Sequence, residues 1–216
     1  MKKVAVILSG SGYLDGSEIH EATLTLLALD RRHAQIQCFA PDIEQEQVIN
    51  HVTGEPSTGT RSVLAEAARI ARGAIKPLSQ AHVDDFDAAI IPGGYGAARN
   101  LCNFATHGHD MTMNQEVAIF TRSLHREGKP VGLICIAPVM APAIGGPGTR
   151  CTIGDDSATA TAIETMGGVH VPCAVTECVI DKERKIVSTP AYMLAERITE
   201  AEAGINKLVD AVLDLA

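Results

Sequence analysis

The sequence predicts a single α/β domain with a mostly parallel central sheet, helices on both faces and a short antiparallel hairpin. Apolar runs of strand length alternate with amphipathic segments of helix length, which is the pattern of successive β-α-β units. Hydrophobic residues make up 46 % of the 216 residues but aromatic ones only 3 %, with no Trp, so Ala, Val, Ile and Leu must fill the core. Such a core is typical of a parallel sheet covered by helices, and the length suits one domain.

The first half of the chain begins with a clear β-α-β unit. Strands are expected at Lys3–Ser9 (KVAVILS) and Ala34–Ala40 (AQIQCFA), with a helix over Ile19–Arg31 between them. Between residues 41 and 77 the alternation weakens, because the turn-rich stretch TGEPSTGTRS precedes an Ala-rich amphipathic helix over Val63–Arg72. No internal repeat, low-complexity tract or change of composition marks a linker, so we interpret 41–77 as an insertion in one domain.

The second half continues the alternation and departs from it once. The strand DAAIIPGG is followed by a helix, the strand PVGLIC and another helix. Two strands come next, AVTECVID and KIVSTP, and the charged turn DKERK between them predicts an antiparallel hairpin. A helix then closes the chain. In order, these elements are expected at Asp87–Gly94, Val117–Glu127, Pro130–Cys135, Asp156–Met166, Ala174–Asp181, Lys185–Pro190 and Ala195–Leu213.

The charge and the cysteines narrow the partners and the location. A formal net charge of −8 argues against a nucleic-acid partner, because phosphate binding depends on clustered Lys and Arg. No apolar run approaches the ~18 residues of a membrane span, so we expect no membrane association and a small, diffusible substrate. The six cysteines are scattered without C-x-x-C spacing, which predicts reduced thiols and a cytoplasmic location.

Three loops are expected to meet at one edge of the sheet. In open parallel sheets, ligands bind at the carboxyl ends of the strands. Here the first strand leads to Glu18, the third to Gly93 and Gly94, and the fourth to Cys135. The sequence therefore predicts a site that these three loops share.

Cys135 is the candidate nucleophile. It lies between a buried strand and Pro138, a residue suited to the first turn of a helix. A sharp turn between strand and helix exposes a nucleophile, and the helix N-terminal amides favour a thiolate. The flanking glycines of the G-x-S-x-G motif are missing, and a small buried hydrophobic residue is the alternative interpretation.

Gly93, Gly94 and Glu18 gain meaning only through their position near Cys135. Glycines after a buried strand let backbone amides approach a ligand and donate to a developing oxyanion, although an ordinary turn explains them equally well. Glu18 lies near the start of a predicted helix, where the helix dipole favours a carboxylate in any case. Alone, Glu18 would be a cap residue.

Two other motifs give weak indications of a cofactor or a metal. Gly10-Ser11-Gly12 resembles the start of a dinucleotide-binding loop, but the third glycine would fall at Asp15, whose charge repels a pyrophosphate. His107 and His109 have no third ligand nearby in the sequence. We therefore expect no cofactor and no metal.

Several long segments of the chain resemble the ElbB family, the enhancing-lycopene-biosynthesis or isoprenoid-biosynthesis glyoxalase proteins. The segments are VILSGSGYLDGSEIHEA, CFAPD, VINHVTGE, IIPGGYGAARNL, CIAP and VSTPAYMLA. They extend from Lys2 to the final helix, so the resemblance covers essentially the whole chain.

This resemblance implies a fold and a set of site residues. The family belongs to the DJ-one/PfpI superfamily, related to class I glutamine amidotransferases, which has a flavodoxin-like three-layer sandwich and a cysteine on a nucleophile elbow. That cysteine matches Cys135, the superfamily's glutamate beside it matches Glu18, and its oxyanion-site glycines match Gly93 and Gly94. Superfamily members are commonly dimers, so the resemblance also implies a homodimer.

One departure from the superfamily concerns a histidine that many members carry about twenty residues after the cysteine. Asp155 stands at that distance, and no His lies between Cys135 and His170. A Cys-His dyad is thus unsupported, which disfavours amidase, amidotransferase or protease chemistry. Asp155 is expected in the substrate-binding wall, and Glu18 is the remaining ionisable partner.

The resemblance implies a weak, cofactor-independent glyoxalase, a lyase that converts glyoxal to glycolate and methylglyoxal to lactate, with apparent deglycase activity as the same chemistry. In this interpretation Cys135 adds to the aldehyde, amides near Gly94 and Ile136 hold the alkoxide, and Glu18 moves protons through an enediol. The alternative is a non-enzymatic redox-sensing or chaperone-like protein in which Cys135 is oxidised to a sulfinate that a protonated Glu18 stabilises.

Overall fold

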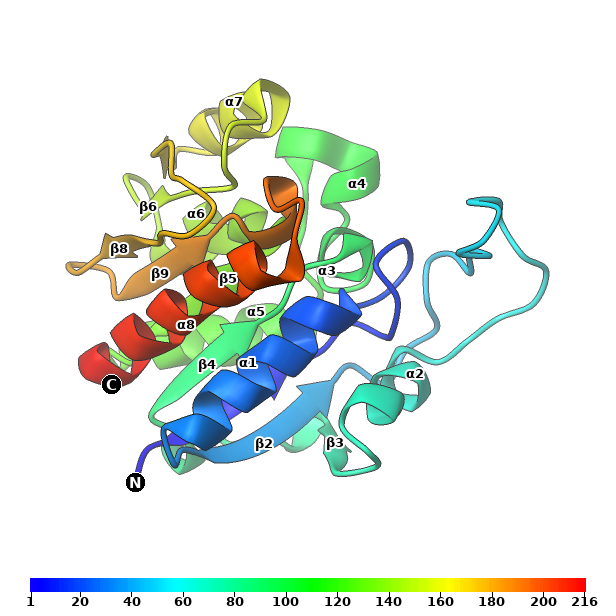
Figure 1. Cartoon of the computed structure of the whole chain (residues 1–216), viewed down its shortest axis with the longest axis horizontal. Helices are drawn as coiled ribbons and strands as arrows, with labels where there is room; N and C mark the ends of the chain where they lie inside the picture. The colour runs from blue at the N-terminus through cyan, green and yellow to red at the C-terminus, as the bar shows by residue number, and fades with distance from the viewer.

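The central sheet has seven strands in the order β3-β2-β1-β4-β5-β9-β8 in the computed structural model, which describes residues 1–216 (Figure 1). Neighbouring strands are parallel except β8 and β9, which form the antiparallel hairpin. The predicted mostly parallel sheet and the predicted antiparallel hairpin are both confirmed. The strands are β1 (Lys3–Ile7), β2 (Gln35–Ala40), β3 (Ile75–Pro77), β4 (Ala88–Ile91), β5 (Val131–Ile134), β8 (Val179–Asp181) and β9 (Ile186–Thr189).

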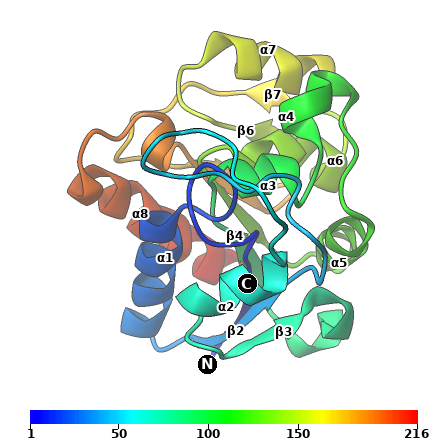
Figure 2. The ribbon, with the colours of Figure 1, turned by 90° about the vertical axis from the view of Figure 1, so that its right-hand side faces the viewer.

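Helices cover both faces of this sheet. Figure 2 shows α1 and α8 on one side and α5 on the other. A small two-stranded parallel sheet, β6 with β7, lies beside α7 and was not predicted. The helices are α1 (Ile19–Arg31), α2 (Val63–Ile70), α3 (Tyr95–Arg99), α4 (Phe104–His107), α5 (Gln115–Arg126), α6 (Ala141–Gly145), α7 (Ser157–Thr165) and α8 (Ile198–Leu215), and the small sheet consists of β6 (Arg150–Cys151) and β7 (Val169–His170).

The alternation of side chains along β1 shows why two helical layers are needed. Val4 and Val6 pack in the core on the α1 and α8 side, whereas Ala5 and Ile7 pack in the core on the α5 side. All four side chains are fully buried, because successive residues of a strand point to opposite faces. The result is the predicted three-layer sandwich.

Six consecutive strands, β3-β2-β1-β4-β5-β9, are parallel. Without the short edge strand β3, the other five have the flavodoxin-type order, 2-1-3-4-5 when counted among themselves. In this order, strands are added first on the β2 side of β1 and then, from β4 on, on its other side. Ligands bind outside the carboxyl ends of the strands at this switch point between β1 and β4. The topology thus directs attention to the loops after β1, β4 and β5.

The predicted insertion at 41–77 is shorter than expected. Ile75–Pro77 is an edge strand of the main sheet, paired with β2, and α2 is the ordinary crossover helix between these two strands. A proline and only three residues suit an edge position, where few ladder hydrogen bonds are needed, and such a strand has little sequence signal. The additional segment is therefore the loop 41–62, which extends away from the sheet in Figure 1.

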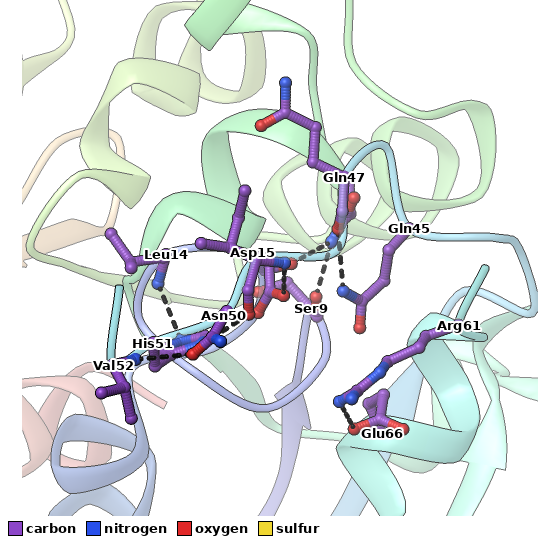
Figure 3. A network of polar contacts seen from close by, with 12 residues as sticks. Ser9, Leu14, Asp15, Gln45, Gln47, Asn50, His51, Val52, Arg61 and Glu66 are labelled. Carbon is purple, nitrogen blue, oxygen red and sulfur yellow. Dashed lines mark hydrogen bonds and ion pairs between the residues drawn. The ribbon is translucent and has the colours of Figure 1, made fainter. Parts of the chain in front are cut away.

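The loop 41–62 is joined to the loop after β1 by two side chains (Figure 3). The buried Asp15 carboxylate accepts the backbone N–H of Ile49 at 2.8 Å. The backbone N–H of Leu14 donates to His51 Nε2 at 3.3 Å, and the His51 ring packs edge-on against Tyr13. Loop 41–62 therefore helps to hold the loop that carries Tyr13.

Candidate active site

A cavity of about 450 Å³ lies at the carboxyl edge of the sheet, and the loops after β1, β4, β5 and β9 contribute to its wall. Its volume is within the ~300–1,000 Å³ range of ligand sites. The predicted convergence therefore occurs. The wall consists of Tyr13, Glu18, Gly94, Tyr95, Ala98, Arg99, Phe104, Ala105, Cys135, Ile136, Asp156, Thr159, Tyr192 and Met193.

Cys135 occupies a sharp turn directly after β5. Its φ of 63° is in the left-handed region, which a residue with a Cβ rarely adopts. Its backbone N–H donates to the Thr189 carbonyl oxygen of β9 at 2.9 Å, which anchors the turn. A 3-10 turn at Ala137–Met140, with Pro138 near its start, carries the chain on to α6. This geometry is that of the predicted nucleophile elbow.

The surroundings of the Cys135 sulfur act on its pKa in opposite directions. Burial raises the pKa of the thiol well above its usual range, and the nearby Glu21 carboxylate raises it further. The backbone N–H groups of Gly94 and Ile136 donate toward the sulfur and lower its pKa. These are two of the amides expected at the oxyanion site, and they favour negative charge on the sulfur or on an oxygen bonded next to it.

Glu21, a residue that the sequence did not single out, is the carboxyl group within hydrogen-bonding reach of the Cys135 thiol. It is fully buried, and its two oxygens accept the backbone N–H groups of Gly93 at 2.9 Å and Tyr192 at 3.1 Å. Burial and then the charge of Glu18 raise the pKa of Glu21 to about 8. At neutral pH this carboxyl group is mostly protonated and can donate toward the sulfur.

Glu18 has a different position from the one that the resemblance implies. It is the N-cap residue of α1 and accepts the backbone N–H of Glu21 at 2.6 Å. It is half-buried in the cavity wall, and burial raises its pKa. The carboxyl group beside the thiol is thus that of Glu21, while Glu18 faces the space where a substrate would lie.

A signal for Glu21 was present in the sequence. Glu21, Thr25 and Ala28 follow the i, i+4, i+7 spacing of one helix face, and all three are buried in α1. A glutamate on the buried stripe of a helix needs a partner or a proton. That anomaly could have identified Glu21 without any resemblance.

Gly93 and Gly94 have separate tasks. The Gly93 N–H is bonded to Glu21, so the amide aimed at the sulfur is that of Gly94. A Cβ added to Gly93 would overlap the Cys135 Cβ and come within 2.8 Å of the Ile134 carbonyl oxygen. Gly93 therefore permits the close approach of β4 and the elbow, and only Gly94 belongs to the wall.

Asp156, rather than the expected Asp155, lies in the cavity wall. Its carboxylate is the N-cap of α7 and accepts the Thr159 backbone N–H at 2.7 Å. Asp155 is exposed and has no place in the wall. The expectation was one residue out of register, because the residue that caps α7 and faces the cavity is the second of the two adjacent aspartates.

A tyrosine-histidine pair stands beside the cavity and was also missed. The Tyr192 hydroxyl in the wall is 2.8 Å from His20 Nδ1, and His20 is exposed. The two residues are separated by 172 positions in the chain, so no local pattern could have paired them. This pair links the cavity wall to the protein surface.

The other cysteines lie outside this wall. Burial raises the pKa of Cys38 to about 11 and the pKa values of Cys102 and Cys151 to about 12. No group of three or more His, Cys, Asp or Glu residues is placed to hold a metal ion. None of the helices has both the length and the apolar character required to span a bilayer.

No protein-family model matches the sequence, but curated relatives do. The chain is 44 % identical to the human "glutamine amidotransferase-like class 1 domain-containing protein 3, mitochondrial", covering 99 % of this chain and 83 % of the relative. It is 44 % identical to the rat "ES1 protein homolog, mitochondrial", covering 99 % and 84 %. For the zebrafish "ES1 protein, mitochondrial" the identity is 34 %, covering 88 % and 76 %.

These relatives correct the expected location. All three are named as mitochondrial proteins, which contradicts the cytoplasmic location inferred from the sequence. The inference was wrong because scattered, reduced cysteines distinguish an oxidising from a reducing compartment and do not distinguish between reducing ones.

Solved structures agree with the architecture. An isoprenoid biosynthesis protein with an amidotransferase-like domain from Ehrlichia chaffeensis is 36 % identical, with a TM-score of 0.93 that covers 100 % of this chain and 99 % of that chain. DJ-1beta of Drosophila melanogaster is 18 % identical with a TM-score of 0.56, covering 100 % and 95 %. The second likeness shows the fold alone, which is the flavodoxin-like DJ-1 (DJ-one)/PfpI fold.

Proposed function

This chain belongs to the family of ES1 and glutamine amidotransferase-like class 1 domain-containing proteins, and we propose that it acts as a cofactor-independent glyoxalase on small 2-oxoaldehydes. The observation that carries the proposal is the elbow thiol of Cys135. It meets a cavity, two backbone N–H donors and the carboxyl group of Glu21 at one point. Such a site can add a thiol to a carbonyl group and hold the oxygen that becomes charged.

In the first step the Cys135 thiol adds across the aldehyde C=O of glyoxal. The S–C bond forms, the carbonyl oxygen becomes an alkoxide held by the N–H groups of Gly94 and Ile136, and the proton from sulfur passes to that oxygen. Glu21 assists because its protonated carboxyl group donates to the sulfur as charge develops there. The product is a hemithioacetal on Cys135.

In the second step Glu18 takes the proton from the carbon that bears sulfur. The electrons form an enediol with the neighbouring carbonyl group, and the same carboxyl group returns the proton to the second carbon. Glu18 suits this task because it lines the cavity, whereas Glu21 lies behind the sulfur. The enediol collapses to a thioester of glycolate on Cys135.

In the third step water hydrolyses the thioester and restores the thiol. Glyoxal and one water thereby give glycolate and a proton, with no net oxidation or reduction. The Tyr192 hydroxyl, bonded to His20, is placed to orient this water and to exchange protons with solvent. It offers a proton route in a site whose wall contains no histidine.

The proposal is tested by glycolate formation from glyoxal with purified protein and its Cys135→Ser variant. We expect slow turnover by the parent protein and at least a hundredfold loss in the variant, because a serine hydroxyl stays protonated near neutral pH. Cys173→Ser is the matched control, since Cys173 is a partly exposed thiol outside the cavity. Full activity in Cys135→Ser, or none in the parent protein, would remove the proposal.

A redox-sensing role is the second candidate, and the buried Glu21 carboxyl group beside the Cys135 thiol is the observation that favours it. A buried neutral carboxyl group beside a thiol can donate a hydrogen bond to a sulfinate formed by peroxide. Peptide mass analysis after peroxide treatment tests this role. Selective oxidation of Cys135 that depends on Glu21, in a protein without glyoxal turnover, would replace the enzyme proposal with this one.

A further inference from the structure

The cavity is larger than glyoxal, the substrate used to test the proposed function. A four-heavy-atom dialdehyde fills only a small part of about 450 Å³, a volume that suits ligands several times larger. The wall beyond Cys135 is mainly apolar, with Ala98, Phe104, Ala105 and Met193 among its members. The space is thus suited to an organic stem that extends away from the reacting aldehyde.

Arg99 is the only Lys, Arg or His in this wall. It belongs to α3, the short helix that begins after Gly94, and Tyr95, Ala98 and Arg99 line the cavity together. Their i, i+3, i+4 spacing places them on one helix face. The N-cap residue of α3, Gly94, supplies an N–H donor at the sulfur, and α3 itself carries a guanidinium group about one turn farther along the wall.

The Arg99 guanidinium group is weakly engaged within the protein. Its Nη1 contacts Glu46 Oε2 at 3.4 Å, and its centre lies 5.7 Å from the centroid of the Tyr95 ring. Its Nε is buried without a hydrogen-bond partner. A guanidinium group has five N–H donors, and a buried donor without a partner calls for an explanation.

The two acidic groups of the wall are each committed to a helix. Glu18 accepts a backbone N–H at the start of α1, and Asp156 accepts one at the start of α7. The positive ends of these helices offset the negative charges. Arg99 has no such fixed partner apart from Glu46, whose side chain is 34 % exposed to water.

We propose that the substrate of this site is a 2-oxoaldehyde on an organic stem that ends in a carboxylate or phosphate group, and that Arg99 binds this anion. The proposal rests on the glyoxalase chemistry above for the aldehyde end. The stem lies along the apolar wall, and the anion completes the hydrogen bonds of the guanidinium group. Arginine suits either anion because its planar donors match two oxygens at once.

The test compares phenylglyoxal with 4-carboxyphenylglyoxal, two substrates that differ only in the terminal charge. The readout is kcat/KM for formation of the mandelate product. We expect the parent protein to prefer the carboxylated compound and Arg99→Gln to lose about tenfold or more of that preference, the usual effect of a hydrogen bond to a charged group. Arg99→Lys should keep part of it, and Arg126→Gln, on the exposed end of α5, should keep all of it.

A binding measurement separates this inference from the glyoxalase proposal. In Cys135→Ser, 4-acetylbenzoate, 4-acetylphenyl phosphate and neutral acetophenone are compared by ligand-observed NMR, with and without Arg99→Gln. Binding of either anion that depends on Arg99 supports the anion site even if no aldehyde is turned over, and the tighter anion identifies the end group. Equal binding of acetophenone and both anions, or a substrate preference unchanged in Arg99→Gln, would overturn it while leaving glyoxal turnover intact.

Discussion

Glu21 and Cys135 form a coupled pair at the residue scale, and the position of their protons decides what the site can do. Both groups are deeply buried, so both resist ionisation. Charge on Glu21 and the hydrogen bond that the thiol donates to its carboxyl group both raise the pKa of the thiol. A protonated Glu21 donates in return only to a sulfur that has become negative. Near neutral pH the pair is therefore held in the neutral state and develops charge only when a carbonyl carbon accepts the sulfur.

Glu21→Gln should change how stability depends on pH. The pKa of Glu21 is about 8 in the folded protein against 4.5 for an unperturbed glutamate, so its contribution to stability is complete below 4.5 and lost as the pH rises through 8. We expect urea midpoints of the parent protein to fall between pH 5.5 and 8.5 more steeply than those of the variant.

The same variant has a cost at low pH. Its amide NH₂ cannot accept the second backbone N–H, so one of the Gly93 and Tyr192 donors is left unpaired, at about 1–3 kcal/mol. The difference in urea midpoint between the parent protein and Glu21→Gln should thus narrow or reverse above pH 8. Parallel curves for the two proteins would show that Glu21 does not titrate in this range.

At the scale of elements, the sequence predicted the strands and long helices because each has a periodic apolar pattern. α1 begins and ends at the residues expected from its pattern, and Cys135 follows β5 as expected. The elbow cysteine was predictable because two local features, a buried strand and Pro138, frame it. Glu21 was missed because Glu18, the N-cap residue of α1, is the carboxylate that the family resemblance matches. β3 was missed because three residues are too few to show a periodic pattern.

The pairing of Tyr192 with His20 could not be predicted for a different reason. The order of strands brings the loop after β9 close to the start of α1. Hydrophobic patterns in one sequence predict strands but do not predict their order in the sheet. Which of Asp155 and Asp156 faces the cavity depends on which of them is the N-cap of α7. The N-cap is Asp156, because its backbone is extended and its side chain accepts the Thr159 N–H. Adjacent identical residues give no sequence signal for that choice.

The N-cap of α7 supports a prediction with a matched control. Asp156→Ala should lower the free energy of unfolding by ~1 kcal/mol at pH 7, the usual effect of losing an Asp cap. Asp155→Ala, one position earlier and exposed, should change it by less than ~0.5 kcal/mol. Urea midpoints measure both. If the two variants lose the same stability, the cap is not at Asp156.

The stability that the Asp156 cap contributes also depends on pH. The Thr159 hydroxyl and the Thr159 backbone N–H lower the pKa of Asp156 below its ordinary 3.8. The stabilisation is therefore present above 3.8 and lost as the pH falls through the lower folded value. The difference between Asp156→Ala and the parent protein should disappear in strong acid.

On the scale of the whole molecule, the loop 41–62 has one free part and one fixed part. Val52–Thr60 is exposed throughout, whereas Gln45 and Val48 are buried, Asp15 accepts the Ile49 N–H and His51 accepts the Leu14 N–H. The sheet joins the parts of the chain before and after this loop, because β3 and β4 from the later part pair with β2 and β1 from the earlier part. A break in the free part should therefore leave the fold whole.

Limited digestion with proteinase K should cut first between Val52 and Thr60, since exposed loop tips are the preferred sites of nicking. We expect two fragments on a denaturing gel and a single native-sized peak in gel filtration. A first cut elsewhere, or fragments that separate without denaturant, would contradict this description of the sheet. The same column, with light scattering, tests the homodimer that stays a prediction from the resemblance.

The bond between the Cys135 N–H and the Thr189 carbonyl oxygen has a consequence for biosynthesis. β5 receives its second neighbour, β9, only after residue 189 has been made, more than fifty residues after the elbow itself. Until then the left-handed turn at Cys135 lacks the strand that holds it, and Tyr192 has not yet joined Glu21. A ribosome-bound chain that has not yet reached residue 189 therefore carries an ordinary cysteine at position 135, and the elbow forms only after β9 and Tyr192 have been added.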